Sequence, residues 1–422
     1  MSAYQRALDA LYARTAGGTR LGLERTAALL EKMGNPHHDF RSLHVAGTNG
    51  KGSVVATVAA VLRANGCRTG AYTSPHLVDF RERIVVDGEP ISEERVIAFA
   101  AEWLPACDRL GATFFEATTA LAFADFAERG VEIAVVETGL GGRLDSTNVI
   151  TPAAAAVTSV AKDHTDLLGE TLQAIAAEKA GIFKAGVPAI IGEPDPRLAE
   201  ELERHALRSG ARPLLVRETW EVGAVAVNAA GTRFTIDRGA VTGSLRTPLV
   251  GAHQAGNAVI ALALLAAAGE LPDVAGVQRG LGAVHLPGRF DRRGAVIFDV
   301  AHNAAGAAAL AATLAAAPPP RPVVALLGVL SDKDWRSMLS VLAPMLDGMV
   351  CTVPPSAPAD RRWDPEAAAE EARALGVRAE AVPGFDEALA RGAGGAGTLL
   401  VTGSFHTVGD AMFRLQVDPL RA

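Results

Sequence analysis

The stretch His44-Val45-Ala46-Gly47-Thr48-Asn49-Gly50-Lys51-Gly52-Ser53 is the most informative part of this 422-residue chain. It leads from an apolar segment through a Gly-Lys loop into a segment with the composition of a helix. Glycines let the main chain approach an anion closely, and amide N–H groups at a helix N-terminus attract negative charge. A glycine-rich turn before a helix would look similar, but the lysine favours a site for a nucleoside triphosphate.

This loop departs from the common pattern G-x-x-x-x-G-K-[ST]. Val45 stands where that pattern has its first glycine, and Gly52 stands where it has a hydroxyl. The hydroxyl follows one place later, at Ser53. The departure narrows the choice of family, because few families carry this shorter form.

Length, charge and cysteine spacing limit the protein class. A chain of this length normally forms two or three domains. The net charge of −7 argues against a nucleic-acid-binding surface. Cys67, Cys107 and Cys351 are far apart, which argues against a disulfide framework or a zinc site. The first residues lack the apolar core of a signal peptide, and the run Ala304–Ala317 is too short to span a bilayer. We therefore expect a soluble cytoplasmic protein with no membrane partner.

Strand-like and helix-like segments alternate along the first two thirds of the chain. This alternation predicts an α/β fold with a mainly parallel sheet covered by helices. The expected strands are Ser42–Ala46, Val131–Glu137, Ala153–Val160 and Val187–Ile191. The expected helices are Ser53–Ala64, Glu93–Trp103, Glu116–Glu128, Thr171–Lys179 and Asn257–Ala268. Between them, the alternating pattern over Arg212–Arg246 suggests antiparallel strands.

A second α/β unit is expected after the string His285-Leu286-Pro287-Gly288, which interrupts the pattern. Strands are expected there at Ala295–Val300, Val323–Leu327, Gly348–Val353 and Thr398–Thr402. We therefore predict two domains, residues 1–286 and residues 287–422. The second has an ordinary domain size.

Polar residues stand where several expected strands end, which is where ligands of open α/β sheets bind. Glu137 ends a strand before a glycine-rich loop and could bind Mg²⁺, although a capping role would give the same pattern. His164 could contact a metal or phosphate, although a lone histidine is more often structural. Asp299 and His302 lie near the carboxyl end of a strand of the second unit. By themselves, Glu178 and Lys179 look like a charged pair at a helix end.

Twelve strings of the chain, in order, resemble one known family. They are GLER from Gly22, HVAGTNGKGS from His44, TSPHL from Thr73, TFFE from Thr113, ETGLGGRLDSTN from Glu137, DHTDLLG from Asp163, EKAGI from Glu178, GAHQAGNA from Gly251, PGRF from Pro287, DVAHN from Asp299, SDKD from Ser331 and TGSFHTVGD from Thr402. Together they resemble the dihydrofolate synthase/folylpolyglutamate synthase family of the Mur-ligase superfamily, over nearly the whole chain.

The resemblance implies a Mur-ligase-like P-loop ATPase domain of the central type, which binds ATP and folate, followed by a Rossmann-like C-terminal glutamate-ligase domain. It implies an ATP-dependent amide ligase that works through an acyl phosphate, and it favours a monomer. The implied small-molecule partners are dihydropteroate, reduced folates and L-glutamate. The implied cofactors are ATP and Mg²⁺, with two ions expected and a carbamylated Lys179 as a ligand.

The resemblance also assigns roles to individual residues. Catalytic roles fall to Lys51, Lys179 and His302. ATP contacts fall to Thr48, Asn49, Gly50, Lys51, Gly52, Ser53, Asn257, Arg289 and Asp299. Metal ligands are Ser74, Glu137, His164 and Lys179. The pterin and glutamate pockets fall to Thr113, Phe114, Phe115, Glu116, Leu144, Asp145, Ser146 and Ser404. A Mg²⁺ held by Ser74, Glu137 and His164 also makes a hydroxyl beside Lys51 less necessary.

Two positions depart from the family pattern and leave the glutamate end of the site open. The chain has Ala304 where proline is common, and His406 where tyrosine is common. A bifunctional dihydrofolate synthase/folylpolyglutamate synthase is the leading hypothesis. A monofunctional folylpolyglutamate synthase, another Mur-type amide ligase, and an ATP-binding switch or scaffold without ligase activity are the alternatives.

Overall fold

The N-terminal half is built on one large sheet. The computed structural model describes residues 1–15 and 20–421. The strands of this sheet are β1 (Arg41–Ala46), β2 (Thr69–Tyr72), β3 (Ile84–Val86), β4 (Glu89–Pro90), β5 (Ile133–Glu137), β6 (Ala154–Val157), β7 (Pro188–Ile191) and β8 (Arg212–Leu215). Their order is β4-β3-β2-β5-β1-β6-β7-β8. The six strands β2, β5, β1, β6, β7 and β8 are parallel to one another. Strands β3 and β4 extend the β2 edge of the sheet and pair in antiparallel fashion. The expected mainly parallel sheet is confirmed.

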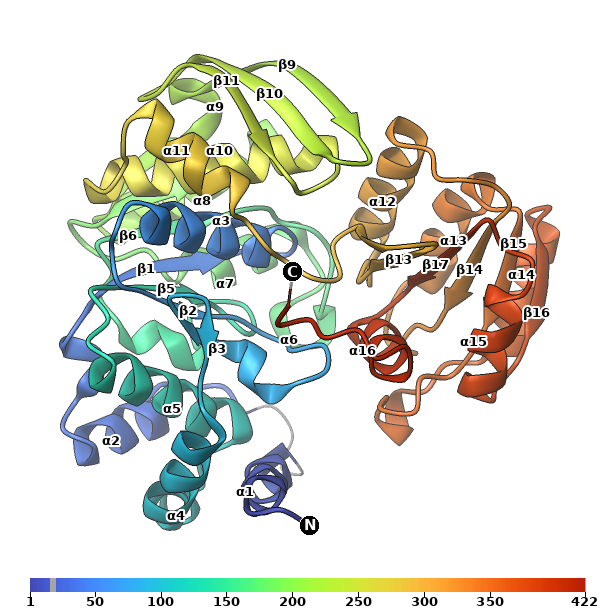
Figure 1. Cartoon of the computed structure of the whole chain (residues 1–422). Coiled ribbons are helices and arrows are strands. Elements are labelled where there is room, and N and C mark those ends of the chain that lie inside the picture. Colours follow the sequence, from blue (N-terminus) through green and yellow to red (C-terminus); the bar gives the residue numbers. More distant parts are fainter. Residues whose placement is uncertain (16–19, 422) are drawn as a thin grey trace.

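Helices cover both faces of this sheet (Figure 1). One face carries α3 (Lys51–Ala64), α10 (Ala252–Ala268) and α11 (Val274–Gly282). The other face carries α1 (Ala3–Tyr12), α2 (Glu24–Lys32), α4 (Glu93–Leu110), α5 (Phe114–Glu128), α7 (Leu172–Ala180) and α8 (Pro196–Arg208). In β5, Val135 packs toward α3, and Val136 packs toward α5. Both side chains are buried, as the continuous apolar run of a covered parallel strand requires.

A small antiparallel sheet lies on α10. It contains β9 (Glu221–Asn228), β10 (Gly231–Arg238) and β11 (Gly243–Thr247), and the short helix α9 (Val216–Thr219) precedes it. Phe234 and Ile236 of β10 pack into the same core as α10. The expectation of antiparallel strands over Arg212–Arg246 is therefore correct for this sheet. It is wrong for Arg212–Leu215, because that segment pairs in parallel with β7 at the edge of the large sheet.

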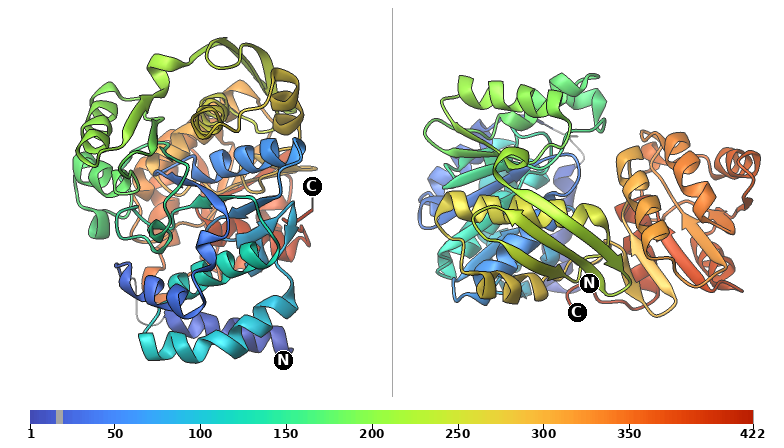
Figure 2. Two further views of the ribbon diagram at one scale, coloured as in Figure 1. Left: turned by 90° about the vertical axis from the view of Figure 1, so that its left-hand side faces the viewer. Right: turned by 90° about the horizontal axis from the view of Figure 1, so that it is seen from above.

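The C-terminal half has its own sheet (Figure 2). Its strands are β12 (Asp291–Arg293), β13 (Val296–Asp299), β14 (Val323–Leu327), β15 (Gly348–Cys351), β16 (Arg378–Ala381) and β17 (Thr398–Thr402), in the order β12-β13-β17-β14-β15-β16. Only β12 runs antiparallel to its neighbour among these described strands. Helices α12 (Ala304–Ala316), α13 (Trp335–Leu342) and α14 (Pro365–Ala374) cover one face. Helices α15 (Phe385–Ala393) and α16 (Phe405–Arg414) cover the other.

The two halves approach each other closely where the loop after β2 meets α16. The carboxylate of Glu82 accepts hydrogen bonds from the main-chain N–H groups of Leu77 (2.9 Å), Val78 (2.7 Å) and Asp79 (2.6 Å). The loop pinned in this way packs against α16. A Cβ atom at Gly409 would overlap the carbonyl oxygen of Leu77. Glycine at 409 therefore allows the two main chains to approach this closely.

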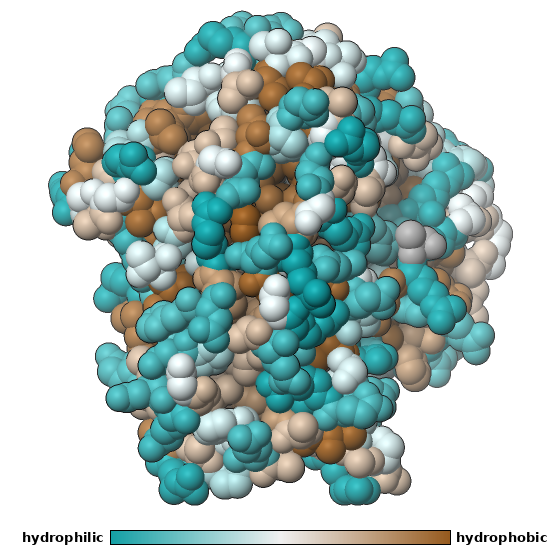
Figure 3. Space-filling view, turned by 60° about the vertical axis from the view of Figure 1, so that its left-hand side comes forward, coloured by the Kyte–Doolittle hydropathy of each residue, from teal (hydrophilic) through white to brown (hydrophobic). Residues whose placement is uncertain are grey.

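The outer surface is mixed. On the face drawn in Figure 3, hydrophilic residues cover much of the surface, with apolar atoms between them. Among the described residues, no helix combines the length and the apolar character that crossing a bilayer requires.

Candidate active site

A cavity of about 580 Å³ lies between the two halves. The loop Gly47–Ser53 after β1, the residues after β5, and the segment after β6 line it from the N-terminal half. The residues after β13 and β17 line it from the C-terminal half. The carboxyl ends of strands from two separate sheets thus face one space, which is the usual ligand position in open α/β sheets.

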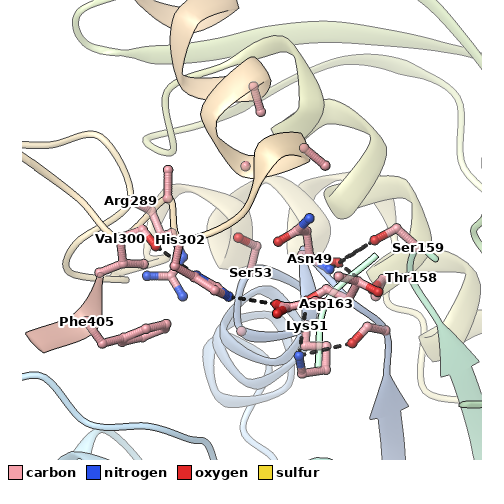
Figure 4. Close-up of a pocket in the computed structure, with 18 of the residues that line it drawn as sticks. Asn49, Lys51, Ser53, Thr158, Ser159, Asp163, Arg289, Val300, His302 and Phe405 are labelled. Atoms are coloured by element: carbon pink, nitrogen blue, oxygen red, sulfur yellow. Dashed lines mark hydrogen bonds and ion pairs between the residues drawn. The ribbon is translucent and has the colours of Figure 1, made fainter. Parts of the chain in front are cut away.

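The loop Gly47–Ser53 has the geometry of an anion cradle (Figure 4). Gly50 stands at the N-cap of α3 with a left-handed φ of 86°. A Cβ atom at Gly50 would lie 2.5 Å from Asn257 Oδ1, and one at Gly47 would overlap Thr158 Oγ1. Helix α3 begins at Lys51, two residues before the expected Ser53. The loop therefore includes the first turn of α3, whose main-chain N–H groups are free to bind an anion in the cavity.

Lys51 and Glu137 face each other beside this cradle. Lys51 Nζ donates to the carbonyl oxygens of Gly47 (3.1 Å) and Thr48 (3.3 Å), and it lies 3.9 Å from Glu137 Oε1. Glu137 Oε2 accepts from the N–H of Ser74 at 3.1 Å. Burial raises the pKa of Glu137, although the Lys51 charge acts against that rise. The two predicted ligands Ser74 and Glu137 are therefore neighbours.

The carboxylate oxygens of Glu137 fit a hard cation such as Mg²⁺. Within residues 1–15 and 20–421, no three His, Cys, Asp or Glu side chains meet at a spacing that would hold a metal ion. In nucleotide enzymes, Mg²⁺ is usually held by one or two carboxylates together with substrate phosphates. Glu137 beside an anion cradle meets this requirement.

Lys179 lines the same cavity from the end of α7. It is 4% exposed, and burial together with the charge of Lys51 lowers its pKa to about 7. Gly142 holds the main chain here, because a Cβ atom at 142 would lie 2.8 Å from the carbonyl oxygens of Glu178 and Lys179. Glu178 and Lys179 do lie at the end of a helix, as expected, but Lys179 is buried and lines the cavity.

Asp163 joins the two halves across the cavity. It follows β6, and its Oδ2 lies 3.3 Å from His302 Nε2 and accepts from Asn303 Nδ2 at 3.1 Å. Its Oδ1 pairs with Lys333 Nζ at 2.5 Å. Burial alone would raise the pKa of Asp163, but His302 and Lys333 outweigh it and hold that pKa well below its usual range. Figure 4 shows Asp163 directed toward His302.

Arg289, Phe405 and Asp299 complete the wall on the C-terminal side. The guanidinium of Arg289 lies 5.1 Å from the ring centre of Phe405. The ring centres of His302 and Phe405 are 5.5 Å apart. Asp299 accepts from the N–H groups of Phe290 (2.9 Å) and Ala301 (2.9 Å). Burial raises the pKa of Asp299, with Arg289 acting in the opposite direction. Burial likewise lowers the pKa of Arg289.

Most of the predicted site residues meet in this cavity. They are Thr48, Asn49, Gly50, Lys51, Gly52, Ser53, Ser74, Glu137, His164, Lys179, Asn257, Arg289, Asp299, His302 and Ser404. Ser404 has a structural task as well. Its hydroxyl N-caps α16 and donates to the Gly328 carbonyl oxygen at 2.9 Å.

The seven remaining predicted residues are outside the lining of this cavity: Thr113, Phe114, Phe115, Glu116, Leu144, Asp145 and Ser146. Thr113 and Glu116 form a capping box at the start of α5, and the buried Glu116 carboxylate also binds Arg25. Phe115 lies against Gly139 of the adjoining glycine-rich loop, which does line the cavity.

Asp145 is committed to hydrogen bonds within the protein. Its Oδ2 accepts from the N–H of Leu140 at 2.8 Å, and its Oδ1 accepts from the N–H and the hydroxyl of Thr147 at 3.0 and 2.5 Å. The Thr147 hydroxyl also lies 2.8 Å from Nε2 of the fully buried His44. In this geometry Asp145 shapes the loop that it follows.

Asp163, Lys333 and Asn303 are the residues that sequence reasoning left without a role. All three lie within quoted strings, DHTDLLG, SDKD and DVAHN, so a signal was present. The contact between Asp163 and Lys333 spans 170 residues of sequence, and no local pattern reveals it.

Comparison with known proteins agrees with this arrangement. The Mur ligase middle domain model matches residues 45–265, and the model of the Mur ligase glutamate ligase domain matches residues 288–405. The dihydrofolate synthase/folylpolyglutamate synthase of Escherichia coli is 35% identical over 93% of this chain and 90% of its own length.

Two solved structures have the same fold. E. coli FolC in complex with DHPP and ADP matches with a TM-score of 0.87 and 33% identity, over 98% of both chains. A bifunctional folylpolyglutamate synthase/dihydrofolate synthase with Mn, AMPPNP and L-glutamate bound matches with a TM-score of 0.82 and 34% identity, over 94% of this chain and 95% of the other. The chain therefore belongs to the Mur ligase family, in the group of dihydrofolate synthases/folylpolyglutamate synthases.

Proposed function

We propose that this protein is an ATP-dependent ligase that joins L-glutamate to dihydropteroate and adds further L-glutamates to reduced folates. The observation that carries the proposal is the shared cavity, where Lys51 and Glu137 at the anion cradle face His302 and Arg289 of the other half. The bifunctional relatives described above support the choice of substrates. The proposed domains are residues 1–286 and 287–422.

The proposed reaction has two steps, and the charges of the site suit the first. The substrate carboxylate attacks the γ-phosphate of ATP and forms an acyl phosphate and ADP. Both reactants are anions, so cations must offset their repulsion. The loop Gly47–Ser53 and Lys51 hold the phosphates. Ser74, Glu137 and His164 would hold Mg²⁺, which supplies polarisation of the phosphoryl oxygens when bound.

The second step belongs to the C-terminal side of the cavity. The amino group of L-glutamate attacks the acyl carbon, and phosphate leaves with the electron pair of the broken bond. His302 is proposed to lie near the transferred phosphate, with Asn257, Arg289 and Asp299 as ATP contacts. Closure of the two halves excludes water, which protects the acyl phosphate from hydrolysis.

The proposed pterin pocket lies around the glycine-rich loop after β5. Phe115 packs against Gly139 of that loop, and Asp145 accepts from its Leu140 N–H. Thr113 to Glu116 and Leu144 to Ser146 form the outer part of this pocket, and Ser404 is proposed to lie at the glutamate end.

A carbamate on Lys179 is part of the proposal. Lys179 is 4% exposed and lies within range of the positive Lys51, where an ammonium ion is poorly accommodated. A carbamate replaces that cation with an anion, which can support a second Mg²⁺. The test is ¹³C NMR of protein equilibrated with ¹³C-bicarbonate. A carbamate signal in the wild type that is missing from Lys179→Ala is expected, and an identical spectrum from both proteins would remove the carbamate from the proposal.

The catalytic proposal is tested by ADP release with two substrate pairs, dihydropteroate plus L-glutamate and tetrahydrofolate plus L-glutamate. Turnover with both is expected, each requiring L-glutamate, and Lys51→Ala should abolish both without lowering Tm. Turnover with tetrahydrofolate alone would establish the monofunctional alternative. Absence of glutamate-dependent turnover with either pair would refute the proposal. Size-exclusion chromatography with light scattering tests the proposed monomer.

A further inference from the structure

A chain of three polar side chains lies at the C-terminal rim of the cavity. His406 and Asp410 occupy one face of α16, four residues apart, and Ser356 lies in the loop between β15 and α14. Ser356 Oγ lies 2.9 Å from His406 Nδ1 and 3.0 Å from Asp410 Oδ2. The main-chain N–H of Ser356 also donates to Asp410 Oδ2 at 3.0 Å. Asp410 therefore fixes the position of the serine.

Hydrogen-bond accounting assigns the tautomer of His406. A carboxylate can only accept, so the single hydroxyl hydrogen of Ser356 goes to Asp410. The oxygen of Ser356 must then accept from His406, which places the imidazole hydrogen on Nδ1. Nε2 is left with a free lone pair. The exposed Ser356 holds the Nδ1 edge at the surface, while His406 itself lines the cavity.

We propose that His406 Nε2 accepts a proton from the nitrogen of the incoming L-glutamate as the amide bond forms, and that Ser356 and Asp410 are positioning residues for this step. The inference rests on the proposed function and deepens it. Ser404 and Phe405, which also line the cavity, immediately precede His406, and Phe405 contacts His302. His406 therefore reaches the cavity from the side where the second step takes place.

The step balances without any additional reactant. The amino group of L-glutamate reacts as the free amine, after its ammonium form has given one proton to water. The nitrogen forms its bond to the acyl carbon, and the bond between that carbon and the phosphate oxygen breaks. Phosphate leaves with that electron pair, and one nitrogen-bound proton moves to Nε2, from which it passes to water. The nitrogen becomes far more acidic once it is bonded to carbon, so a neutral imidazole is a sufficient base.

The surroundings of His406 keep the imidazole neutral at physiological pH. Burial lowers its pKa, Asp410 acts in the opposite direction, and the positive charge of Arg361 lowers it further. His76, in the loop after β2, is a further titratable group near it, because His406 acts on the pKa of His76. Burial and Arg83 lower the pKa of His76 to about 3, so His76 is also neutral in this range.

The test separates the two half-reactions with two nucleophiles. Acyl phosphate is trapped either by L-glutamate or by hydroxylamine, a weakly basic nucleophile that needs little help from a base. His406→Gln should slow the reaction with L-glutamate about 100-fold, and hydroxamate formation should stay within about twofold of wild type. His205→Gln, on α8 outside the cavity lining, is the matched control and should change neither rate.

The positioning residues are tested through the pH profile of kcat/KM for L-glutamate. The kcat/KM of the wild type should fall at acidic pH as His406 is protonated. Ser356→Ala should shift the pH at which this fall occurs, and Ser356→Thr should restore the wild-type position. If His406→Gln slows both nucleophiles equally, or neither, the proposal for His406 is overturned. A wild type that yields neither product overturns the proposed function itself, so the two failures are distinguishable.

Discussion

Asn49 and Asn303 exchange two hydrogen bonds across the boundary between the halves. Asn49 Nδ2 donates to Asn303 Oδ1 at 3.2 Å, and Asn303 Nδ2 donates to Asn49 Oδ1 at 3.1 Å. Asn49 belongs to the anion cradle, and Asn303 is the N-cap of α12. The pair therefore couples the proposed phosphate site directly to the position of the C-terminal half.

Removing either amide should weaken ATP use. We expect Asn49→Ala and Asn303→Ala each to raise KM for ATP. The free-energy loss in kcat/KM for ATP of the double variant should be smaller than the sum of the losses of the two single variants. The coupling energy should fall within about 0.5–3 kcal/mol, the range for side chains in direct contact. Steady-state ADP release over a range of ATP concentrations measures it. Strict additivity would show that the two amides act independently.

Asp163→Asn should lower the stability and the rate of ADP release far more than Asp332→Asn does. The first change leaves Lys333, whose side chain is 6% exposed, without its close carboxylate partner. Breaking a buried pair in this way costs about 3–5 kcal/mol. Asp332 is also near Lys333 at 3.7 Å, but its side chain is 37% exposed, so its loss should cost less than about 1 kcal/mol. Thermal unfolding and ADP release of both variants provide the comparison, and equal effects would contradict it.

Gly142→Ala should lower kcat through Lys179. The added methyl group would push against the carbonyl oxygens of Glu178 and Lys179. A displacement of a catalytic group by about 1 Å can reduce the rate by about 100-fold. Gly282→Ala, at a helical position with open space around it, is the matched control and should leave kcat and Tm unchanged or slightly raise Tm. A Gly142→Ala enzyme with normal kcat would exclude this role.

His44 should make stability depend on pH. Burial, together with the charge of Lys184, lowers its pKa in the folded protein to about 3. In the unfolded chain the value is about 6.5, so the unfolded state binds the proton more readily between these values. Acid therefore favours unfolding, and the stabilising contribution that is complete above about pH 6.5 is lost toward lower pH.

The comparison is between the wild type and His44→Gln in urea unfolding. The free-energy advantage of the wild type should shrink by up to about 1.4 kcal/mol for each pH unit below about 6.5. Because the glutamine does not titrate in this range, the variant should show the weaker pH dependence. An advantage that stays constant from neutral to mildly acidic pH would contradict the assignment.

Sequence patterns located the elements that bury continuous apolar runs. Strands β14 and β17 match their expected bounds at Val323–Leu327 and Thr398–Thr402, because both lie inside a covered parallel sheet. Strand β16 has exposed or half-exposed residues throughout Arg378–Ala381 and gave no such signal. Helix α4 extends beyond the expected Trp103 to Leu110, through Pro105, because Leu104 and Cys107 continue its buried face.

The sequence predicted those parts of the site whose residues lie close together in one loop. The cradle around Lys51 and the neighbouring Glu137 follow from strand ends and glycines. The contact of Asp163 with Lys333 and the capping task of Glu116 depend on the packing of distant segments, which no spacing rule contains. Resemblance assigned Glu116 and Asp145 to a substrate pocket, whereas in the fold Glu116 caps α5 and pairs with Arg25, and Asp145 accepts from Leu140 and Thr147.

The glycine at 409 lies on α16, one helical turn after His406, and touches the loop after β2 instead of the cavity. Its lack of a side chain is what lets α16 rest on the loop that Glu82 pins. A methyl group there would act as a wedge, and the displacement would be carried along α16 to His406 and Phe405 at the cavity rim. The width of the cavity thus depends partly on the smallest residue of this contact. Selection on catalysis can then act through a position that touches no substrate.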